Sequence, residues 1–141
     1  MPDQPLSGTY LGFDYVQKYI GIAVGQTISK TANPVCVLDN SNHIDWKQID
    51  EIADEWSPTG FVVGLPLTAD GEQTTVLKEI KKFIGQLSAR YKLPVHDIDE
   101  HLSSHAAKDL LKTRSQRRMG RLDDTAAAVI LQTWLDQQRL D

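Results

Sequence analysis

Five acidic side chains, spread along the whole chain, are the residues best suited to chemistry. Asp14 stands near the end of an apolar stretch, and the others form two adjacent pairs, Asp99 with Glu100 and Asp123 with Asp124. Carboxylates brought together from these places would raise one another's pKa unless cations compensated. Hard ions such as Mg²⁺ or Mn²⁺ do this, and two of them about 4 Å apart can activate water against a phosphodiester. The pattern indicates a metal-dependent nuclease, provided that the fold joins the acids.

The strands that must position these acids follow from apolar runs rich in β-branched and aromatic residues. Residues 9–26 predict two strands joined by a tight turn at 16–18, and 34–39 a third, which together make an antiparallel meander. The run at 60–65 lacks alternation, as expected for a strand buried on both faces. The last strand is expected at 93–98, and Asp99 and Glu100 follow it directly.

Helical periodicity fills the rest of the chain. A helix is expected over 46–56, with Asp45 and Gln48 forming a capping box at its start. A helix at 102–113 and a final helix from about 123 to 138 follow later in the chain. A long helix lies between the helix at 46–56 and the helix at 102–113. The residues expected on the apolar faces of the first, long and final helices are Trp46, Ile49, Ala53 and Trp56; Val76, Ile80, Phe83, Ile84 and Leu87; and Ala127, Ile130, Leu131 and Trp134.

The element order is therefore β-β-β-α-β-α-β-α-α, which predicts an α/β fold with a mixed five-stranded sheet and helices on both faces. Right-handed crossovers place the two later strands beside the first, so three carboxyl ends share one edge, where ligands bind in open α/β folds. Asp14 and Glu100 should reach this edge. Asp123 joins them if the last helix begins there.

Each acid also has a structural interpretation. Asp123 and Asp124 fit a helix cap that complements the dipole, and Glu100 fits a solvated residue ahead of a helix. Asp14 is harder to explain in this way, because acidic residues are depleted in strands.

A cluster of cations directly before Asp123 fits a nucleic-acid substrate. A positive segment beside an anionic metal site is what a phosphate backbone needs, although a solvated loop is the alternative. The segment has no aromatic residue for stacking, which indicates a grip through charge. The cations are Lys108, Lys112, Arg114, Arg117, Arg118 and Arg121.

The remaining chemistry-bearing residues carry weaker signals. The four histidines lack the ligand spacing of a zinc site; His101 and His105 are either ordinary surface residues or proton-transfer groups near the acids. Cys36 lies in an apolar run and is expected in the core. The pair of tryptophans in the first helix is expected in the core, with a base-stacking platform as the minor alternative.

Composition sets the broad class. A chain of 141 residues predicts one domain, residues 1–141, with 1–8 as a loose tail. A single cysteine and the absence of a membrane-length apolar run predict a soluble, cytoplasmic protein that does not bind membranes. The net charge of −4 excludes a uniformly basic nucleic-acid coat, not a local basic patch.

Short motifs make the chain familiar. They are Gly-Phe-Asp-Tyr at 12–15, Ile-Gly-Ile-Ala-Val-Gly at 20–25, Val-Gly-Leu-Pro-Leu at 63–67 with Asp70-Gly71, Asp-Glu-His-Leu-Ser-Ser at 99–104, and Leu-Asp-Asp-Thr-Ala-Ala-Ala at 122–128. In this order they resemble the YqgF/RuvX family, of the RuvC-like group in the ribonuclease H superfamily. The resemblance implies a ribonuclease H-like fold and a metal-dependent nuclease that matures the 5′ end of pre-16S ribosomal RNA, or a Holliday-junction resolvase.

Matched motif by motif, the resemblance makes Asp14, Glu100 and Asp123 both the catalytic residues and the ligands of Mg²⁺ or Mn²⁺, as two ions. Lys18 matches the family's lysine at the start of the second strand, and with Lys112, Arg114, Arg117, Arg118 and Arg121 it is expected to bind phosphates. The chain departs from the family at Tyr15-Val16, where glycine is usual after Asp-Phe, and at His101, where arginine is usual.

The sequence thus predicts a nuclease of ribosome biogenesis that binds ribosomal precursor RNA as a monomer or homodimer. A resolvase of branched DNA with the same chemistry is the first alternative, and it requires a dimer with paired sites. A non-catalytic nucleic-acid-binding factor on the same fold is the second.

Overall fold

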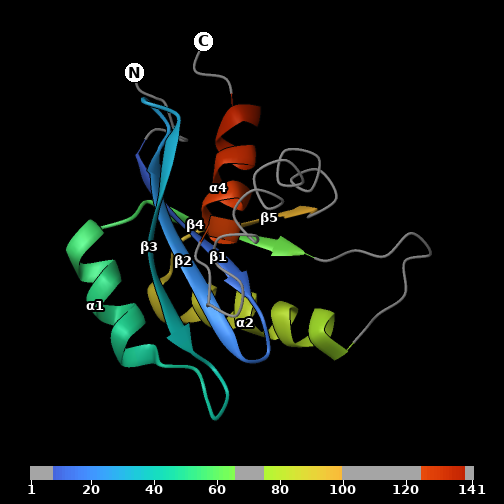
Figure 1. Ribbon diagram of the computed structural model, residues 1–141. Coiled ribbons are helices and arrows are strands. Elements are labelled where there is room, and N and C mark those ends of the chain that lie inside the picture. The colour runs from blue at the N-terminus through green and yellow to red at the C-terminus, as the bar shows by residue number, and fades with distance from the viewer. Residues whose placement is uncertain (1–7, 66–74, 100–124, 139–141) are drawn as a thin grey trace.

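The computed structural model describes residues 8–65, 75–99 and 125–138 (Figure 1). Five of the described elements are strands and three are helices. In chain order they are β1 (Thr9–Tyr15), β2 (Tyr19–Gln26), β3 (Thr31–Asp39), α1 (Trp46–Trp56), β4 (Gly60–Leu65), α2 (Thr75–Tyr91), β5 (Val95–Asp99) and α4 (Thr125–Gln137). The expected helix at 102–113 and the basic segment after it lie outside the described residues.

The strands form one mixed sheet in the order β3-β2-β1-β4-β5. The first three strands are joined antiparallel as a meander, while β4 pairs parallel with β1 and with β5. This is the sheet that the sequence predicts, including the placement of the later strands beside the first. The carboxyl ends of β1, β4 and β5 therefore lie at one edge of the sheet.

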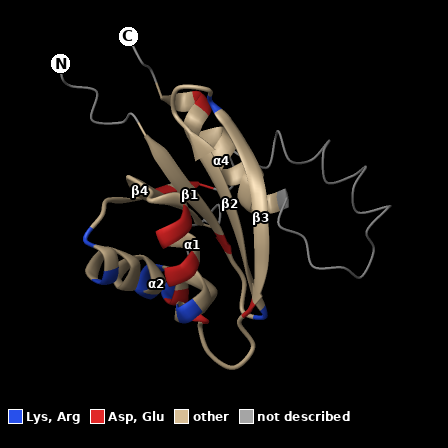
Figure 2. Ribbon diagram, turned by 90° about the vertical axis from the view of Figure 1, so that its left-hand side faces the viewer, with Lys and Arg blue, Asp and Glu red and all other residues tan. Residues whose placement is uncertain are grey.

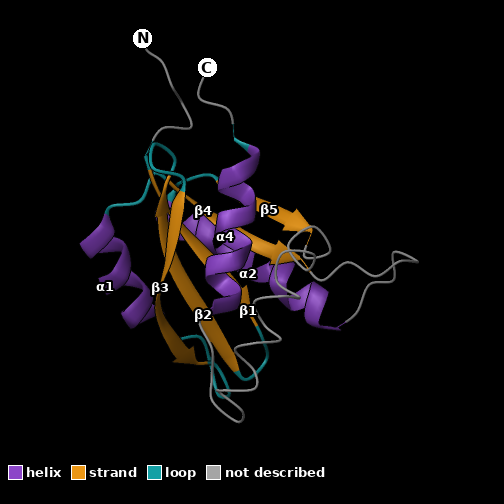
Figure 3. Ribbon diagram, turned by 45° about the horizontal axis from the view of Figure 1, so that its top comes forward, coloured by secondary structure: helices purple, strands orange, loops and turns teal. Residues whose placement is uncertain are grey.

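Helices cover both faces of this sheet (Figure 3). On one face, α1 and α2 pack over a core in which Phe13 lies between Phe61 and Phe83, with ring centroids 5.8 and 5.4 Å away. On the other face, α4 packs through Ala127, Ile130, Leu131 and Trp134, which are the four residues expected from its periodicity.

The α4 helix rests directly on the backbone of the sheet at Gly12. A Cβ atom added there would lie 2.7 Å from Leu131 Cβ, which is closer than real Cβ atoms approach, and 3.2 Å from the Ala127 carbonyl oxygen, which is a tight contact. Glycine in β1 and alanine at the start of α4 thus permit a helix–sheet distance that larger residues would not.

A polar cluster fastens α1 to α2 at their solvent side. The Arg90 guanidinium donates to both oxygens of Asp50, with the Nη2–Oδ2 distance at 2.7 Å, and it lies 5.0 Å from the centre of the Trp46 ring. Hydrogen bonds from Arg90 and from the Tyr91 hydroxyl lower the pKa of Asp50 to about 2. Asp45 caps α1 as expected, by accepting a hydrogen bond from the Gln48 amide.

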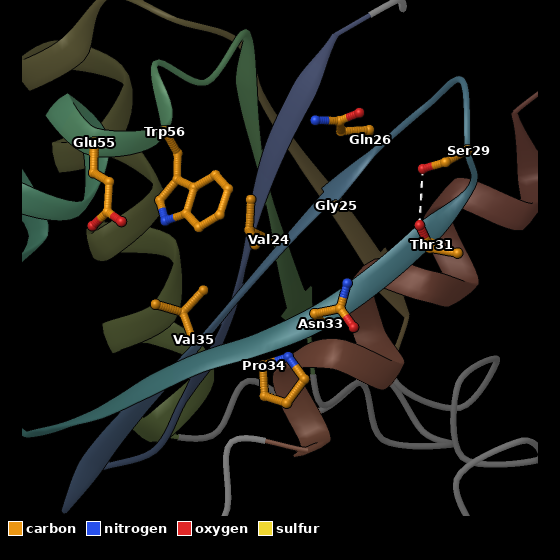
Figure 4. A pocket seen from close by; sticks show the side chains of 10 residues that line it. All are labelled: Val24, Gly25, Gln26, Ser29, Thr31, Asn33, Pro34, Val35, Glu55 and Trp56. Atoms are coloured by element: carbon orange, nitrogen blue, oxygen red, sulfur yellow. Dashed lines mark hydrogen bonds between the residues drawn. The ribbon is translucent and has the colours of Figure 1, made fainter.

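The structure also corrects several expectations. β3 begins at Thr31 and β5 at Val95, so the third strand is longer and the fifth begins later than predicted. Trp56 is 37% exposed and not in the core, because it is the last residue of α1 and covers Val24 and Val35 from one side only (Figure 4). Cys36 is half-buried against the core.

Candidate active site

Asp14 is a nearly buried carboxylate on a central strand. It pairs with Gly21 of β2, and its residue is 8% exposed. Side chains alternate along a strand, and Tyr10 packs with α4 whereas Leu11 and Phe13 pack with the other helices. Asp14 therefore faces the α4 side of the sheet. An acidic side chain is uncommon at so buried a position on a strand, because burial of a carboxylate is costly unless hydrogen bonds or cations stabilise it.

The direction of α4 brings its amino end toward Asp14. Early in the helix the Ala127 carbonyl lies over Gly12, whereas Leu135 lies against Gly25, which is paired with Tyr10 at the other end of β1. The helix thus runs antiparallel to β1, and its first turn points to the carboxyl end of that strand. A helix amino end carries a partial positive charge that favours anions nearby.

The fifth strand ends at the same edge. Phe13 pairs with Val63, and Val63 with Asp97, so Asp14 and Asp99 both lie just beyond this row at the carboxyl ends of their strands. With one strand between them, the backbones of β1 and β5 are about 10 Å apart. Ile98 packs with α4, so even-numbered residues of β5 share the face of Asp14.

Two of the expected site residues can be located. Asp14 is at the edge just described, and Lys18 is exposed in the β1–β2 turn, where its carbonyl accepts a hydrogen bond from the Asn40 amide at 3.0 Å. Within the described part of the chain, no group of three or more histidine, cysteine, aspartate or glutamate side chains gathers as for a metal. The residues that lie outside it are Glu100, Asp123, Lys112, Arg114, Arg117, Arg118 and Arg121, together with His101 and His105.

Asn40 is a residue that sequence reasoning missed. It is 7% exposed, and its side-chain Nδ2 donates to the Val16 carbonyl at 2.9 Å. With its backbone bond to Lys18, it fastens the turn that follows Asp14. The contact joins segments 24 residues apart, and the sequence around Asn40 gives no sign of it beyond an asparagine that follows a strand.

Beside this turn lies a polar pocket of about 400 Å³ on the α1/α2 side of the sheet. It is open to solvent and combines three segments that the sequence does not connect: the β1–β2 turn, the loop before α1, and α2. The lining residues are Tyr15, Gln17, Asn40, Ser41, Asn42, His43, Ile44, Glu79, Lys82 and Gln86.

A larger hollow of about 520 Å³ lies at the opposite end of the sheet (Figure 4). Val24 and Val35 form its floor and Trp56 one wall, and a 2.8 Å hydrogen bond between Ser29 and Thr31 closes the hairpin beside it. It is remote from Asp14, since Val24 pairs with Leu11 near the start of β1.

The remaining described histidine with a clear environment, His96, belongs to the packing. Its ring lies 4.9 Å from that of Trp134 and 6.0 Å from that of Tyr10. Burial lowers its pKa, while the charge of Asp97 acts weakly in the other direction.

Comparison with known proteins identifies the family to which the chain is similar. The family model described as "RuvX: Holliday junction resolvase" matches residues 8–137. A protein of Hydrogenovibrio crunogenus named "Putative pre-16S rRNA nuclease" is 41% identical over 94% of this chain and 97% of its own length. A protein of the same name from Ralstonia pickettii is 42% identical over 94% and 90%.

Solved structures show the same fold at low identity. RuvC of T. thermophilus, in complex with a Holliday junction substrate, matches with a TM-score of 0.60 at 16% identity, over 89% of this chain and 91% of its own. The yeast mitochondrial Holliday junction resolvase Ydc2 matches with a TM-score of 0.51 at 12% identity, over 95% and 80%. The ribonuclease H-like fold expected from the sequence is thereby confirmed. None of the described helices is both long and apolar enough to span a membrane.

Proposed function

The chain belongs to the RuvX family, and from this premise we propose that it hydrolyses phosphodiester bonds in precursor 16S ribosomal RNA. The observation that carries the proposal is Asp14, a nearly buried carboxylate at the edge where β1, β4 and β5 end and toward which α4 points. The names of the relatives supply the substrate.

The residues proposed to hold the metal are Asp14, Glu100 and Asp123. In the chain, Glu100 directly follows β5 and Asp123 comes two residues before the first residue of α4. Three carboxylates are the hard oxygen donors that Mg²⁺ and Mn²⁺ prefer, so the donor set fits. When bound, such an ion supplies a lowered pKa for water and a counter-charge for the phosphate.

The protein's own cations are proposed to orient the RNA. Lys18 is exposed in the turn four residues after Asp14, and the basic residues between 112 and 121 precede Asp123 in the chain. α2 adds the exposed Lys78, Lys81 and Lys82, whereas α1 is acidic (Figure 2). Because α2 packs on the face of the sheet opposite Asp14, its lysines are proposed to contact phosphates away from the cleaved bond.

The test is cleavage of a pre-16S rRNA fragment with Mn²⁺ by the wild type, Asp14→Asn and Glu55→Gln. Because a bound metal ion stabilises the transition state by several kcal/mol and Asp14→Asn removes one of its charged ligands, this variant should lower the rate about a hundredfold or more. Glu55→Gln removes an exposed acid of α1 and should cleave like the wild type. Equal rates for the wild type and Asp14→Asn would remove Asp14 from the mechanism.

A second candidate function, resolution of four-way DNA junctions, is favoured by the description of the family model. A resolvase nicks two strands symmetrically and needs a dimer with paired sites. The same assay with a four-way junction separates the two functions. Our proposal predicts preferred cleavage of the RNA. Paired nicks in the junction, with the RNA left intact and the protein a dimer by sedimentation, would instead establish the resolvase.

A further inference from the structure

The polar pocket beside the β1–β2 turn is large enough to hold one nucleobase. Its volume of about 400 Å³ falls within the range of small-molecule sites, about 300–1,000 Å³. Hydrogen-bonding side chains dominate its lining, and Lys82 supplies a cation. Tyr15 lines the pocket and directly follows Asp14, so the pocket and the proposed site of cleavage lie on opposite faces of the sheet at the same end of β1.

Glu79 marks what the pocket can bind. Its Oε1 accepts a hydrogen bond from the Tyr15 hydroxyl and its Oε2 from the Gln17 amide, both at 3.4 Å. Both distances exceed the usual range of about 2.5–3.2 Å, so these are weak bonds that a better donor could replace. Because the carboxylate is acceptor-only and negative, it disfavours a phosphate in the pocket and favours a group that presents two N–H donors.

The base of an unpaired nucleotide presents such a group. Proteins read single-stranded RNA through hydrogen bonds to the Watson–Crick edges of exposed bases. Guanine carries two adjacent N–H donors on that edge, which match the two oxygens of a carboxylate, whereas uracil carries one donor between two acceptors. Lys82 and the nearby turn with Lys18 would meet the flanking phosphates.

The pocket is also held in shape before any ligand binds. The Tyr15 ring packs on Phe83, with centroids 5.3 Å apart, and Asn40 fastens the turn through Val16 and Lys18. A preformed site loses less conformational entropy on binding, which suits recognition of one nucleotide.

We propose that this pocket binds one unpaired guanine of the substrate strand, with Glu79 reading the two N–H groups of its Watson–Crick edge. The inference rests on the proposed function for the identity of the ligand as RNA. It adds a preference for unpaired guanine within a few nucleotides of the cleaved bond.

The test measures binding without cleavage. Fluorescence anisotropy in EDTA would compare labelled oligouridine RNAs that carry one guanine, one inosine, which lacks the amino group, or neither. A bidentate contact with a base is worth about 1–3 kcal/mol, so we expect the guanine RNA to bind about five- to a hundredfold more tightly than oligouridine. Inosine should fall between them.

Glu79→Gln is the informative variant, and Glu55→Gln at the far end of the sheet is its matched control. Glu79→Gln should bind guanine RNA and oligouridine within about twofold of each other, while the control keeps the preference of the wild type. Thermal unfolding of both variants checks the fold. No preference in the wild type, no RNA binding at all, or a preference that survives in Glu79→Gln would overturn the inference.

The outcome is separable from that of the proposed function. A guanine preference in a protein that cleaves no RNA would support the guanine pocket and refute the nuclease. Cleavage that depends on Asp14, without any guanine preference, would support the nuclease and refute the guanine pocket.

Discussion

The two ends of the sheet are both closed by hydrogen bonds but carry different side chains. We call the end at the β1–β2 turn, residues 16–18, the turn end, and the end at the β2–β3 hairpin, residues 27–30, the hairpin end. At the turn end, the Val16 amide donates to Tyr19 at 2.9 Å and Asn40 fastens the turn. At the hairpin end, the Thr27 amide donates to Gly8 at 3.1 Å, and the Thr27 hydroxyl accepts from the Gly8 amide at 2.9 Å. Backbone closure alone therefore does not distinguish a site of chemistry from a structural end.

The difference lies in where charge is placed. The turn end holds a nearly buried carboxylate, Asp14, beside a pocket of polar side chains. The hairpin end has the larger hollow, but its floor is apolar and its acid, Glu55, is exposed on α1. The comparison teaches that a buried acidic side chain is a better guide to function than the size of a hollow, because its burial is costly unless partners stabilise it.

The largest effect is expected at Gly12, where α4 bridges the two ends. Gly12→Ala places a Cβ 2.7 Å from Leu131 Cβ, and overpacking of this kind costs about 1–3 kcal/mol. Urea unfolding measures the loss. Gly85→Ala is the matched control, since a Cβ there meets nothing within 4 Å and alanine favours a helix by about 0.5–1 kcal/mol. Equal stability of the two variants would contradict the close packing of α4.

A pair of variants then tests whether the two ends differ in function. Asn40→Ala leaves the Val16 carbonyl without its side-chain donor, and Thr27→Val leaves the Gly8 amide without its acceptor. Each should lower the free energy of unfolding by about 1–3 kcal/mol. Only Asn40→Ala should also weaken RNA binding, as measured by anisotropy. A similar loss of binding in Thr27→Val would remove the distinction between the ends.

A smaller effect is expected from His96, which packs on the α4 face and should make the stability depend on pH. Burial lowers the pKa of His96 in the folded state, so the unfolded chain binds more protons near pH 6.5. The free energy of unfolding should therefore be highest above a pH of about 6.5, the pKa of histidine in the unfolded chain, and should decrease as the pH falls below this value. Urea unfolding at pH 7.5 and 5.5 measures this. His96→Phe should show a smaller decrease between the two pH values, and an unchanged decrease would assign it to other groups.

The smallest effect is expected where α1 ends beside the hairpin-end hollow. Ser57 has a left-handed backbone, with φ of 46°, and its amide donates to the Ala53 carbonyl. The left-handed conformation costs an L-residue about 1–2 kcal/mol, and the greater conformational entropy that glycine loses on folding offsets about 0.5–1 kcal/mol of this, so Ser57→Gly should raise the free energy of unfolding by about 0.5–1 kcal/mol. A decrease would show that the serine side chain contributes more than its backbone strain costs.

Much of the fold could be predicted because local patterns and topology agree. The uninterrupted apolar run of β4 and the face of α4 from Ala127 to Trp134 were readable as buried elements, and both are confirmed. Trp56 was misjudged, since periodicity gives the face of a helix but not where the helix extends past its neighbours.

The site was only partly predictable. Asp14 was conspicuous as a charge within an apolar strand, and the structure places it at the expected edge. The polar pocket could not be foreseen, because Tyr15, Asn40 and Glu79 come from segments whose approach depends on tertiary packing. Glu100 and Asp123 lie outside the described residues, so their part in the site stays a prediction.

The most direct test of the central claim is a calorimetric titration with Mn²⁺ of the wild type and of Asp14→Asn, Glu100→Gln and Asp123→Asn. One shared site predicts that the wild type binds the ion and that each of the three variants binds it at least about tenfold more weakly, since each loses a charged ligand. Glu55→Gln should bind like the wild type. Binding of equal strength by all the variants, or no binding by the wild type, would contradict the account.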